Sequence, residues 1–430
     1  MRLDALFQKA RRLRSPAVSF ADQLVASGGN FLTSVLIARL LGLEEFGWYT
    51  LVWIAVLLTM ALHLGAVVSP MMSIGNKFSN GRATRYLTVV IVHEALFCAA
   101  AMVVVGAACA LFVVPNTEIG YGAALLAGLA GGIYVVQDFM RRLLFTRGRP
   151  ALALVIDIVH QGARNAALVL LLMGGGVTLQ TVFFVILLAA LVSILVALPL
   201  AGPFTLDKRL LLPATLRQWR SARWLIPSGL FAWLSANSAI LVISAILGPI
   251  ATGAVRAAYT IVGMLNVLRE ALENSLPQAA AREYAAGGKS ALTRSLVAVS
   301  IAVFTAGAVM SAALFAYGET ATKLIYGDDF AVYGNLLGWL SLTFPLALLN
   351  LTIGCAFRAM ERTGFVFVGV AVAAAVNFIA IVPAVAWYGV PGAIAVVVAA
   401  ELAMTIVFIA GVVALLKPSS SLGRSIKGLK

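Results

Sequence analysis

One segment of the sequence, residues 151–174, places five polar or ionisable side chains on one face of an otherwise apolar helix. Their spacing of three, four, seven and eight residues aligns Asp157, His160, Gln161, Arg164 and Asn165. A charge at mid-membrane costs about 2.5–3.5 kcal/mol, so such groups are candidates for function. Two interpretations stay open: a cationic, proton-responsive wall of a central cavity, or a polar seam whose groups satisfy one another between packed helices.

Two further arginines lie within or at the end of apolar segments. Arg39 closes residues 17–42, and Arg256 begins a stripe that continues through Thr260, Gly263, Glu270 and Asn274. Guanidinium groups bind phosphate oxygens in pairs and stay charged, so they suit an anionic head group that must leave water. The alternative is that both side chains snorkel to the outer head groups. We favour that alternative for Arg39 and a binding role for Arg256.

Acidic side chains in the apolar segments are candidates for a coupling ion. Asp22 lies beside a stripe of small polar residues typical of helix packing, and we expect it either to respond to an ion or to pair with Arg14. Asp157 and Glu270 are further candidates. The remaining ionisable groups are isolated in sequence: His63, His93, Glu94, Asp138 and Glu401. Glu401, about halfway along its segment, is the most expensive of these to bury and therefore the best ion site among them.

Metal and nucleotide sites are not predicted. The three histidines lie on three different segments, and no two have the spacing of metal ligands. Gly287 to Ser290 imitates the end of a phosphate-binding loop, but Glu283 stands where that loop needs glycine. We therefore expect no cofactor.

The elements that would carry these side chains are membrane-spanning helices. Hydrophobic residues make up 62% of the 430 residues and charged residues 11%, whereas a soluble domain is about half apolar and a quarter charged. A span needs about 20 apolar residues, and about twelve such segments follow one another. They are 17–42, 46–69, 86–114, 120–140, 151–174, 177–200, 224–248, 252–275, 292–317, 333–357, 364–386 and 390–416. The sequence predicts an all-α polytopic membrane protein without a separate soluble domain.

The net charge of +14 reflects orientation in the membrane. Lysine and arginine concentrate before the first span and in every second connection, whereas the intervening connections hold Glu44, Glu45, Glu118, Glu319, Asp328 and Asp329. This alternation is the positive-inside rule and predicts an inner-membrane protein with both termini in the cytoplasm. It also argues against a nucleic-acid partner, because the basic residues are explained by topology.

A short pattern recurs in the two halves of the chain. Leu41–Gly47 and Leu247–Gly253 both read Leu-Gly, four residues, Gly, at an offset of 206 residues that also pairs the surrounding apolar segments. The pattern predicts two parallel six-helix lobes, 1–203 and 224–430, joined by a basic cytoplasmic linker at 204–223, with a central cavity between the lobes. The alternative is chance recurrence in a glycine-rich membrane sequence.

Residues Ile37 to Tyr49, with the sequence IARLLGLEEFGWY, resemble the segment with which Wzx-type polysaccharide flippases begin. These flippases belong to the multidrug/oligosaccharidyl-lipid/polysaccharide (MOP) exporter superfamily, whose fold is MATE-like. The resemblance implies translocation of an undecaprenyl-pyrophosphate-linked oligosaccharide to the periplasmic leaflet by alternating access, in exopolysaccharide, capsule or O-antigen biosynthesis. It also implies membrane lipids, a polysaccharide polymerase and a chain-length regulator as partners. The second turn carries Ile250 and Ala251 where an acidic residue is common, so we take Glu44 and Glu45 as charges at a helix N-terminus.

The sequence is consistent with three functions. A flippase is favoured by three arginines, Arg39, Arg164 and Arg256. With His160 and Asn165 they are the predicted substrate-binding residues of a cationic cavity. A cation-coupled multidrug exporter of the same superfamily should instead favour acidic and aromatic cavity residues. A membrane-embedded polymerase or ligase usually needs a sizeable outer loop, and the longest outer connection, about residues 318–332, offers only the pair Asp328 and Asp329. We therefore expect a transporter rather than an enzyme.

Overall fold

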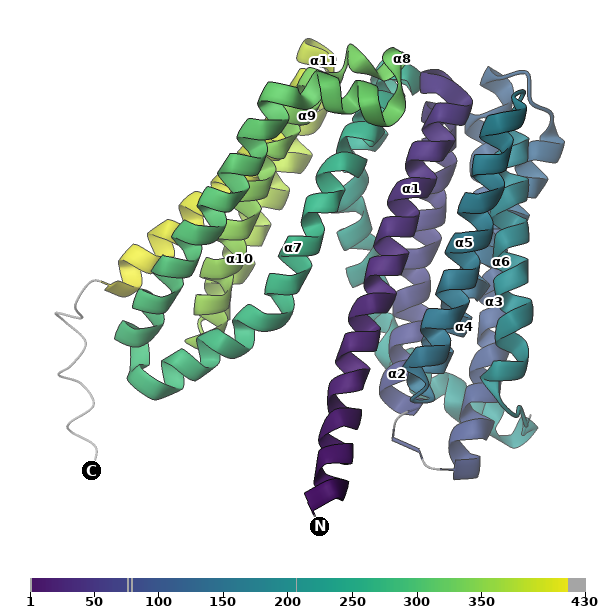
Figure 1. Ribbon diagram of the computed structural model, residues 1–430, viewed down its shortest axis with the longest axis horizontal. Coiled ribbons are helices and arrows are strands. Elements are labelled where there is room, and N and C mark those ends of the chain that lie inside the picture. Colours follow the sequence, from purple (N-terminus) through teal and green to yellow (C-terminus); the bar gives the residue numbers. More distant parts are fainter. Residues whose placement is uncertain (1, 76, 79, 206, 417–430) are drawn as a thin grey trace. The chain divides into compact units, whose positions relative to one another are not determined.

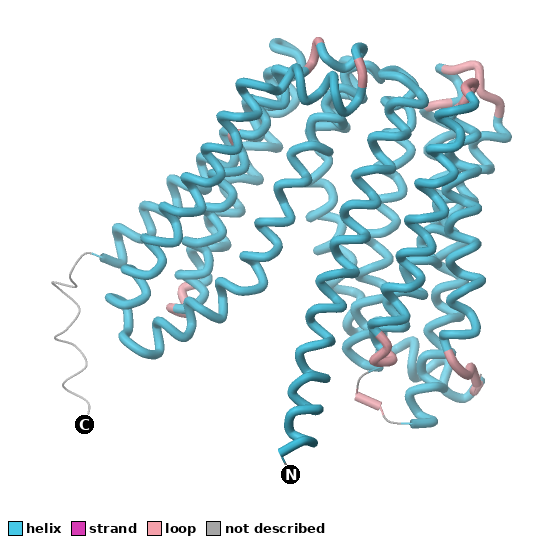
Figure 2. Tube along the Cα trace, viewed as in Figure 1, coloured by secondary structure: helices cyan, strands magenta, loops and turns pink. Residues whose placement is uncertain are grey.

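The structure, a computed structural model, describes residues 2–75, 77–78, 80–205 and 207–416, without the side chains of 2–20, 80, 266, 267, 271, 274 and 416. These residues contain helices and no strand (Figure 2). The helices longer than one turn are α1 (Arg2–His63), η1 (Leu64–Val68), α2 (Ser69–Gly75), α3 (Asn80–Phe112), α4 (Tyr121–Thr146), α5 (Pro150–Gly174), α6 (Leu179–Ala201), α7 (Leu211–Tyr326), α8 (Asp328–Ala331), α9 (Gly334–Ser341), α10 (Thr343–Ala359) and α11 (Thr363–Leu416). The short helices η2 (Val114–Asn116) and η3 (Lys208–Leu210) lie in connections.

Eight helical stretches of the described chain are long and apolar enough to cross a membrane. Several are too long to be single spans: the 116 residues of α7 would measure about 170 Å if straight. Glycines with positive φ interrupt these stretches at Gly42 (73°), Gly248 (82°), Gly288 (62°) and Gly389 (63°). Other residues pay a steric cost in that conformation. The four breaks fall at or beside connections predicted from the sequence, and the count of twelve spans stays a prediction.

The chain forms two compact units. Unit 1 comprises Met1–Thr260 and Ile325–Phe330. Within it, α4 packs against α3, α5 and α6, and α1 packs against α5 (Figure 1). An apolar core that includes Val90, Phe139, Leu143 and Ile156 lies between these helices. Unit 1 therefore holds most of the candidate residues, on helices that contact one another.

Unit 2 comprises Ile261–Leu324 and Ala331–Lys430. Here α10 and α9 pack against α11, and a smaller core contains Leu276, Leu292, Leu296 and Cys355. The lobe boundaries expected at 203 and 224 come from the sequence repeat rather than from contacts between residues, and they stay a prediction.

The two Leu-Gly turns of the repeated pattern lie against each other within unit 1. A methyl group added to Gly47 would overlap the backbone of Pro249, and one added to Gly253 would overlap the carbonyl of Leu43. The first glycine of each pattern has a positive φ, and the second lets the two backbones approach closely. The pattern thus has the same local structure in both places.

Candidate functional site

The polar face of α5 is buried against α1 in unit 1. Asp157, His160, Gln161, Arg164 and Asn165 expose between 1% and 8% of their surfaces. The close approach of the two helices depends on Gly29, where any larger side chain would overlap Gln161. The predicted polar face of residues 151–174 therefore meets the predicted polar stripe of residues 17–42.

Two residues of the α5 face form a seam with α1. Asn165 Nδ2 donates to the carbonyl of Gly29 (3.2 Å), and Asn165 Oδ1 accepts from Thr33 Oγ1 (2.8 Å). Gln161 Nε2 donates to Asn30 Oδ1 (3.2 Å). These hydrogen bonds satisfy the side-chain amides within the protein. They agree with the interpretation of Gln161 and Asn165 as part of a polar seam between packed helices.

Arg164 differs from its neighbours because no carboxylate neutralises it. Its side chain is 1% exposed, and Nη2 donates to Asn30 Oδ1 (2.7 Å) and to Gln161 Oε1. In the described chain no acidic group lies within ion-pair distance of it, and Nε has no acceptor. Asp157, expected beside Arg164 on the helix face, instead forms an ion pair with Arg141 on α4. Arg164 is thus a buried cation held by neutral amides.

Arg141, on α4, forms ion pairs with two of the acidic candidates, Asp157 and Asp22. Its Nε lies 2.7 Å from Asp157 Oδ2, and Nη2 pairs with Asp22. Gln137 Nε2 also donates to Asp157 Oδ1 (3.3 Å). Asp22 therefore has a partner on α4, whereas the side chain of Arg14 lies outside the described residues. Sequence reasoning treated Arg141 only as a topology signal and missed this role.

Three ionisable residues that look isolated in the sequence are joined in unit 1. His63 Nε2 lies 2.6 Å from Glu94 Oε2, and both side chains are almost fully buried. His63 Nδ1 lies 4.0 Å from Asp138 Oδ2, which accepts from Arg142 Nε (2.6 Å). The description of these residues as isolated is wrong, because the packing of α1, α3 and α4 brings them together. Only the i, i+4 spacing of Asp138 and Arg142 signals part of this network.

Arg256, on α7, also has no acidic partner in the described chain. It is half-buried, and the groups that interact with it electrostatically are the phenols of Tyr49 and Tyr326. Tyr49 also interacts with Arg164. The phenol of Tyr49 therefore lies within electrostatic range of both arginines. Nearby, Thr260 Oγ1 and Ser34 Oγ lie 3.3 Å apart, so the polar stripe of α1 reaches α7 as well.

Six aromatic rings of unit 1 form a row that was not foreseen from the sequence. Consecutive ring centroids lie between 5.2 and 6.1 Å apart, in the order Tyr326, Phe330, Phe46, Tyr49, Trp53 and Tyr134. The last ring, Tyr134, lies 5.7 Å from buried His160. These residues come from α1, α4, the end of α7 and α8, so only the fold places them in one row.

Arg39 has a different environment from Arg164 and Arg256. It is exposed, and its Nε donates to the carbonyl of Ile325 in the last turn of α7 (2.6 Å). Arginine bound to the last carbonyls of a helix stabilises that end. Arg39 thus caps α7 and also has further interactions.

The two acidic candidates of unit 2 do not lie free in a cavity. Asn350 Nδ2 donates to Glu401 Oε2 (3.0 Å), and Thr405 Oγ1 donates to Asn350 Oδ1 (2.9 Å). Glu270 is half-buried and has interaction partners. The side chain of Asn274, expected at the inner end of the Arg256 stripe, lies outside the described residues. Like Asp138, Glu401 is joined to its neighbours rather than isolated.

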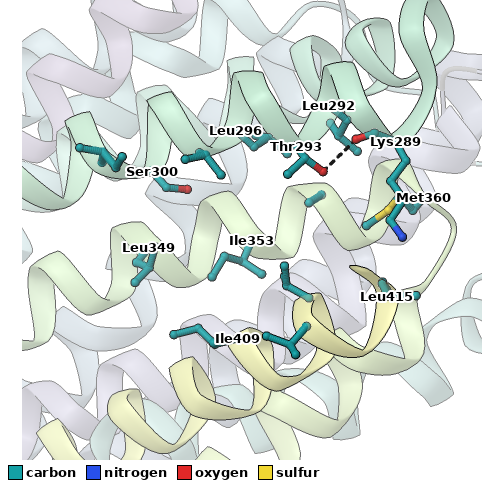
Figure 3. A pocket seen from close by; sticks show the side chains of 15 residues that line it. Lys289, Leu292, Thr293, Leu296, Ser300, Leu349, Ile353, Met360, Ile409 and Leu415 are labelled. Carbon is teal, nitrogen blue, oxygen red and sulfur yellow. Dashed lines mark hydrogen bonds between the residues drawn. The ribbon is translucent and has the colours of Figure 1, made fainter. Parts of the chain in front are cut away.

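A pocket of about 240 Å³ lies in unit 2 between α7, α10 and α11. Figure 3 shows that aliphatic side chains such as Leu296, Ile353 and Ile409 line it, with Lys289 at one end. Thr293 Oγ1 donates to the carbonyl of Lys289 (2.8 Å), which closes a turn of the helix. The pocket contains none of the predicted site residues.

Known structures share this fold. An inward-facing multidrug-resistance MATE transporter of the MOP superfamily matches with a TM-score of 0.69 at 13% identity, covering 91% of this chain and 94% of that chain. The lipid II flippase MurJ matches with a TM-score of 0.66 at 14% identity, covering 93% and 87%. A Pyrococcus furiosus MOP transporter, described with a binding pocket of reverse polarity, matches at 0.61 and 13% identity, covering 94% and 95%.

No protein-family model and no curated protein sequence matches this chain. The chain is a multi-pass membrane protein with the fold of MOP superfamily transporters. This confirms the predicted all-α, MATE-like fold class. At these identities the likeness concerns the fold, and the cargo has to be argued from the site.

Proposed function

We propose that the protein is a flippase that moves an undecaprenyl-pyrophosphate-linked oligosaccharide from the cytoplasmic to the periplasmic leaflet by alternating access. The observation that carries this proposal is that neither Arg164 nor Arg256 has an acidic partner in the described chain. An uncompensated guanidinium in an apolar environment is costly. A pyrophosphate is an anion that would compensate it and would receive paired hydrogen bonds.

The arrangement of the other charges supports an anionic cargo. Arg141 and Arg142 are paired with aspartates, so their positive charge is largely compensated within the protein. Arg164 and Arg256 keep theirs. The resemblance of Ile37 to Tyr49 to Wzx-type flippases adds the oligosaccharide and its undecaprenyl carrier, and the MurJ match provides a lipid flippase of the same fold.

The second candidate is a cation-coupled multidrug exporter. The aromatic row from Tyr326 to Tyr134 and the acidic residues around Arg141 are the kinds of residue expected for such a protein. The MATE match has the same fold. We rank this candidate second because the aspartates around Arg141 have basic partners, whereas Arg164 and Arg256 have no acidic partner in the described chain.

The flippase proposal predicts a specific loss on removal of either arginine. Hydrogen bonds to charged groups contribute about 1.5–3 kcal/mol, so Arg164→Ala and Arg256→Ala should each reduce translocation by roughly tenfold to a hundredfold. The protein should still reach the membrane, while lipid-linked sugar accumulates on the cytoplasmic leaflet. The measurement is surface polysaccharide together with leaflet-resolved labelling of the lipid-linked sugar.

Arg39→Ala is the matched control, because Arg39 binds a backbone carbonyl at the end of α7. It should retain most of the translocation. Normal surface polysaccharide in both the Arg164 and the Arg256 variants would contradict the proposal. Transport of a lipophilic cation by reconstituted protein, lost in the same variants, would support the exporter instead.

The same proposal places the protein in the inner membrane with both termini in the cytoplasm. It also includes a polysaccharide polymerase and a chain-length regulator as partners. In this scheme the protein moves its cargo without altering a covalent bond, so it acts without a cofactor and is not an enzyme. Asp22, Asp157, Glu270 and Glu401 stay proposed coupling-ion residues, with Asp22 and Asp157 acting through Arg141.

A further inference from the structure

The first part of α7, Leu211–Arg223, is termed here the linker helix. It follows η3 and continues directly into the apolar part of α7. One of its faces packs on unit 1 through Ala214, Gln218 and Ala222, which are 8%, 4% and 3% exposed at intervals of four residues. Gln218 Nε2 donates to the carbonyls of Ala66 (3.2 Å) and Val67 (3.4 Å). The linker helix is therefore fixed to the helices of unit 1.

Contacts with α3 set the level of the linker helix relative to the membrane. Gln218 Oε1 and Thr215 Oγ1 lie 2.9 and 2.8 Å from the two ring nitrogens of His93. On α3, exposed large apolar side chains begin at Val92 and end at Phe112. That stretch spans about 30 Å, the thickness of the hydrocarbon core. Nearer the start of α3, Arg82 is exposed instead, and the side chain of Arg85 is half-exposed. His93, and with it the linker helix, lies at the edge of the hydrocarbon core.

A second face of the linker helix is apolar and uncovered. Leu212, Leu216 and Trp219 are 68%, 51% and 57% exposed, and their spacing of four and three residues places them in one stripe. Trp224 follows at 70% exposure. Tryptophan is enriched at the boundary between lipid tails and head groups. An exposed apolar stripe at the edge of the hydrocarbon core is suited to contact with lipid.

Basic side chains border the apolar stripe. Lys208, Arg209, Arg220 and Arg223 are exposed, and none forms an ion pair within the part of the chain that the structure describes. The guanidinium of Arg217 lies over the ring of Phe78, 5.0 Å from the centroid, whereas that of Arg223 lies over the exposed ring of its neighbour Trp224, 5.6 Å from the centroid. A helix with an apolar stripe and unpaired cations beside it lies in the interface plane and attracts anionic lipids.

We propose that the linker helix is an interfacial lipid-binding element: Leu212, Leu216 and Trp219 enter the boundary of the acyl chains, and Arg220 and Arg223 bind the phosphates of anionic phospholipids. The lipid is chosen over a protein partner because the stripe lies at the membrane edge and its cations lack counter-charges. This inference does not depend on the identity of the cargo.

The experiment uses the full chain with its three buried cysteines replaced. A spin label is placed by Leu216→Cys, and a reference label by Glu118→Cys in the exposed connection between α3 and α4. The protein is reconstituted in phosphatidylcholine vesicles with or without phosphatidylglycerol. We expect the label at 216 to be several-fold less accessible to a water-soluble paramagnetic reagent than the label at 118, and to lie deeper when phosphatidylglycerol is present.

The double variant Arg220→Gln/Arg223→Gln should abolish the effect of phosphatidylglycerol on label depth and reduce the number of phosphatidylglycerol molecules that the purified protein retains. Arg217→Gln is the matched control and should leave both unchanged. Equal access of the water-soluble reagent at 216 and 118 in both membranes would overturn the proposal, as would a phosphatidylglycerol effect that survives the double variant. Equal access at 216 and 118 would indicate that the apolar stripe contacts a protein partner instead of lipid.

Discussion

At the scale of single residues, four buried or half-buried arginines of unit 1 fall into two groups. Arg141 and Arg142 have aspartate partners, whereas Arg164 and Arg256 have none in the described chain. Removing one partner of a buried pair leaves an uncompensated charge, which is strongly destabilising. The first group therefore supports the packing of α1, α4 and α5, and the second group is available to an anion.

The buried pair of His63 and Glu94 offers a test of this division at the residue scale. His63→Leu leaves the Glu94 carboxylate without its 2.6 Å partner, and we expect a loss of stability of about 3–5 kcal/mol. The double variant His63→Leu/Glu94→Leu removes both polar groups and should recover much of that loss. Denaturant unfolding of the purified protein in detergent measures the difference.

His93→Leu serves as the control, because His93 is only half-buried and its partners are the neutral groups of Thr215 and Gln218. It should cost less than His63→Leu. If the losses of stability in His63→Leu and Glu94→Leu add up to the loss in the double variant, the pair contributes no coupling energy.

At the scale of elements, glycine determines both where helices break and where they touch. Gly42 and Gly248 break α1 and α7 through their positive φ. Gly29 lets α1 approach Gln161, and Gly47 lets it approach Pro249. These roles are distinct: a break depends on backbone conformation, whereas a contact depends on the missing side chain.

The crossing of the two Leu-Gly turns leads to a prediction about single methyl groups. Gly47→Ala should destabilise unit 1 by about 1–3 kcal/mol, because the new methyl overlaps the backbone of Pro249, which cannot move like a flexible side chain. Gly253→Ala should behave similarly. The measurement is thermal unfolding of the purified protein.

Gly162→Ala on α5 is the matched control. A methyl group there meets nothing within 4 Å, and alanine is favoured over glycine within a helix by about 1 kcal/mol. The Gly162 variant should therefore be as stable as the parent or more stable. Destabilisation at Gly162 equal to that at Gly47 would refute the contact explanation.

At the scale of the whole molecule, charge distribution predicts orientation. Basic residues in alternate connections predict that both termini lie in the cytoplasm. Single cysteines at Glu118 and Lys289 should therefore react from opposite faces of the membrane when an impermeant thiol reagent is added to intact cells. Only the residue in the outer connection, Glu118, should be labelled without lysis.

Labelling of both sites after lysis is the positive control, since both positions are exposed. Labelling of both sites in intact cells would overturn the alternating topology. This result would not affect the lipid-binding role of the linker helix, which depends on its level in the membrane rather than on the side it faces.

The sequence alone determined the features that depend on neighbouring residues. Hydropathy gives the all-helical membrane class, and the Leu-Gly pattern marks the turns at Gly42 and Gly248, because burial in lipid and positive φ are properties of a local segment. The polar face of residues 151–174 also follows from helical spacing alone.

Only the tertiary structure decided which of those polar groups meet. Arg141 pairs with Asp22 across 119 residues, and Arg164 bonds to Asn30 across 134. Helical spacing places Asp157 and Arg164 on one face but does not say that α4 offers a closer cation. Partner choice between helices depends on their packing, which is a non-local property. For that reason the sequence could identify Arg164 and Arg256 as candidates, while only the fold showed that they are left without acidic partners.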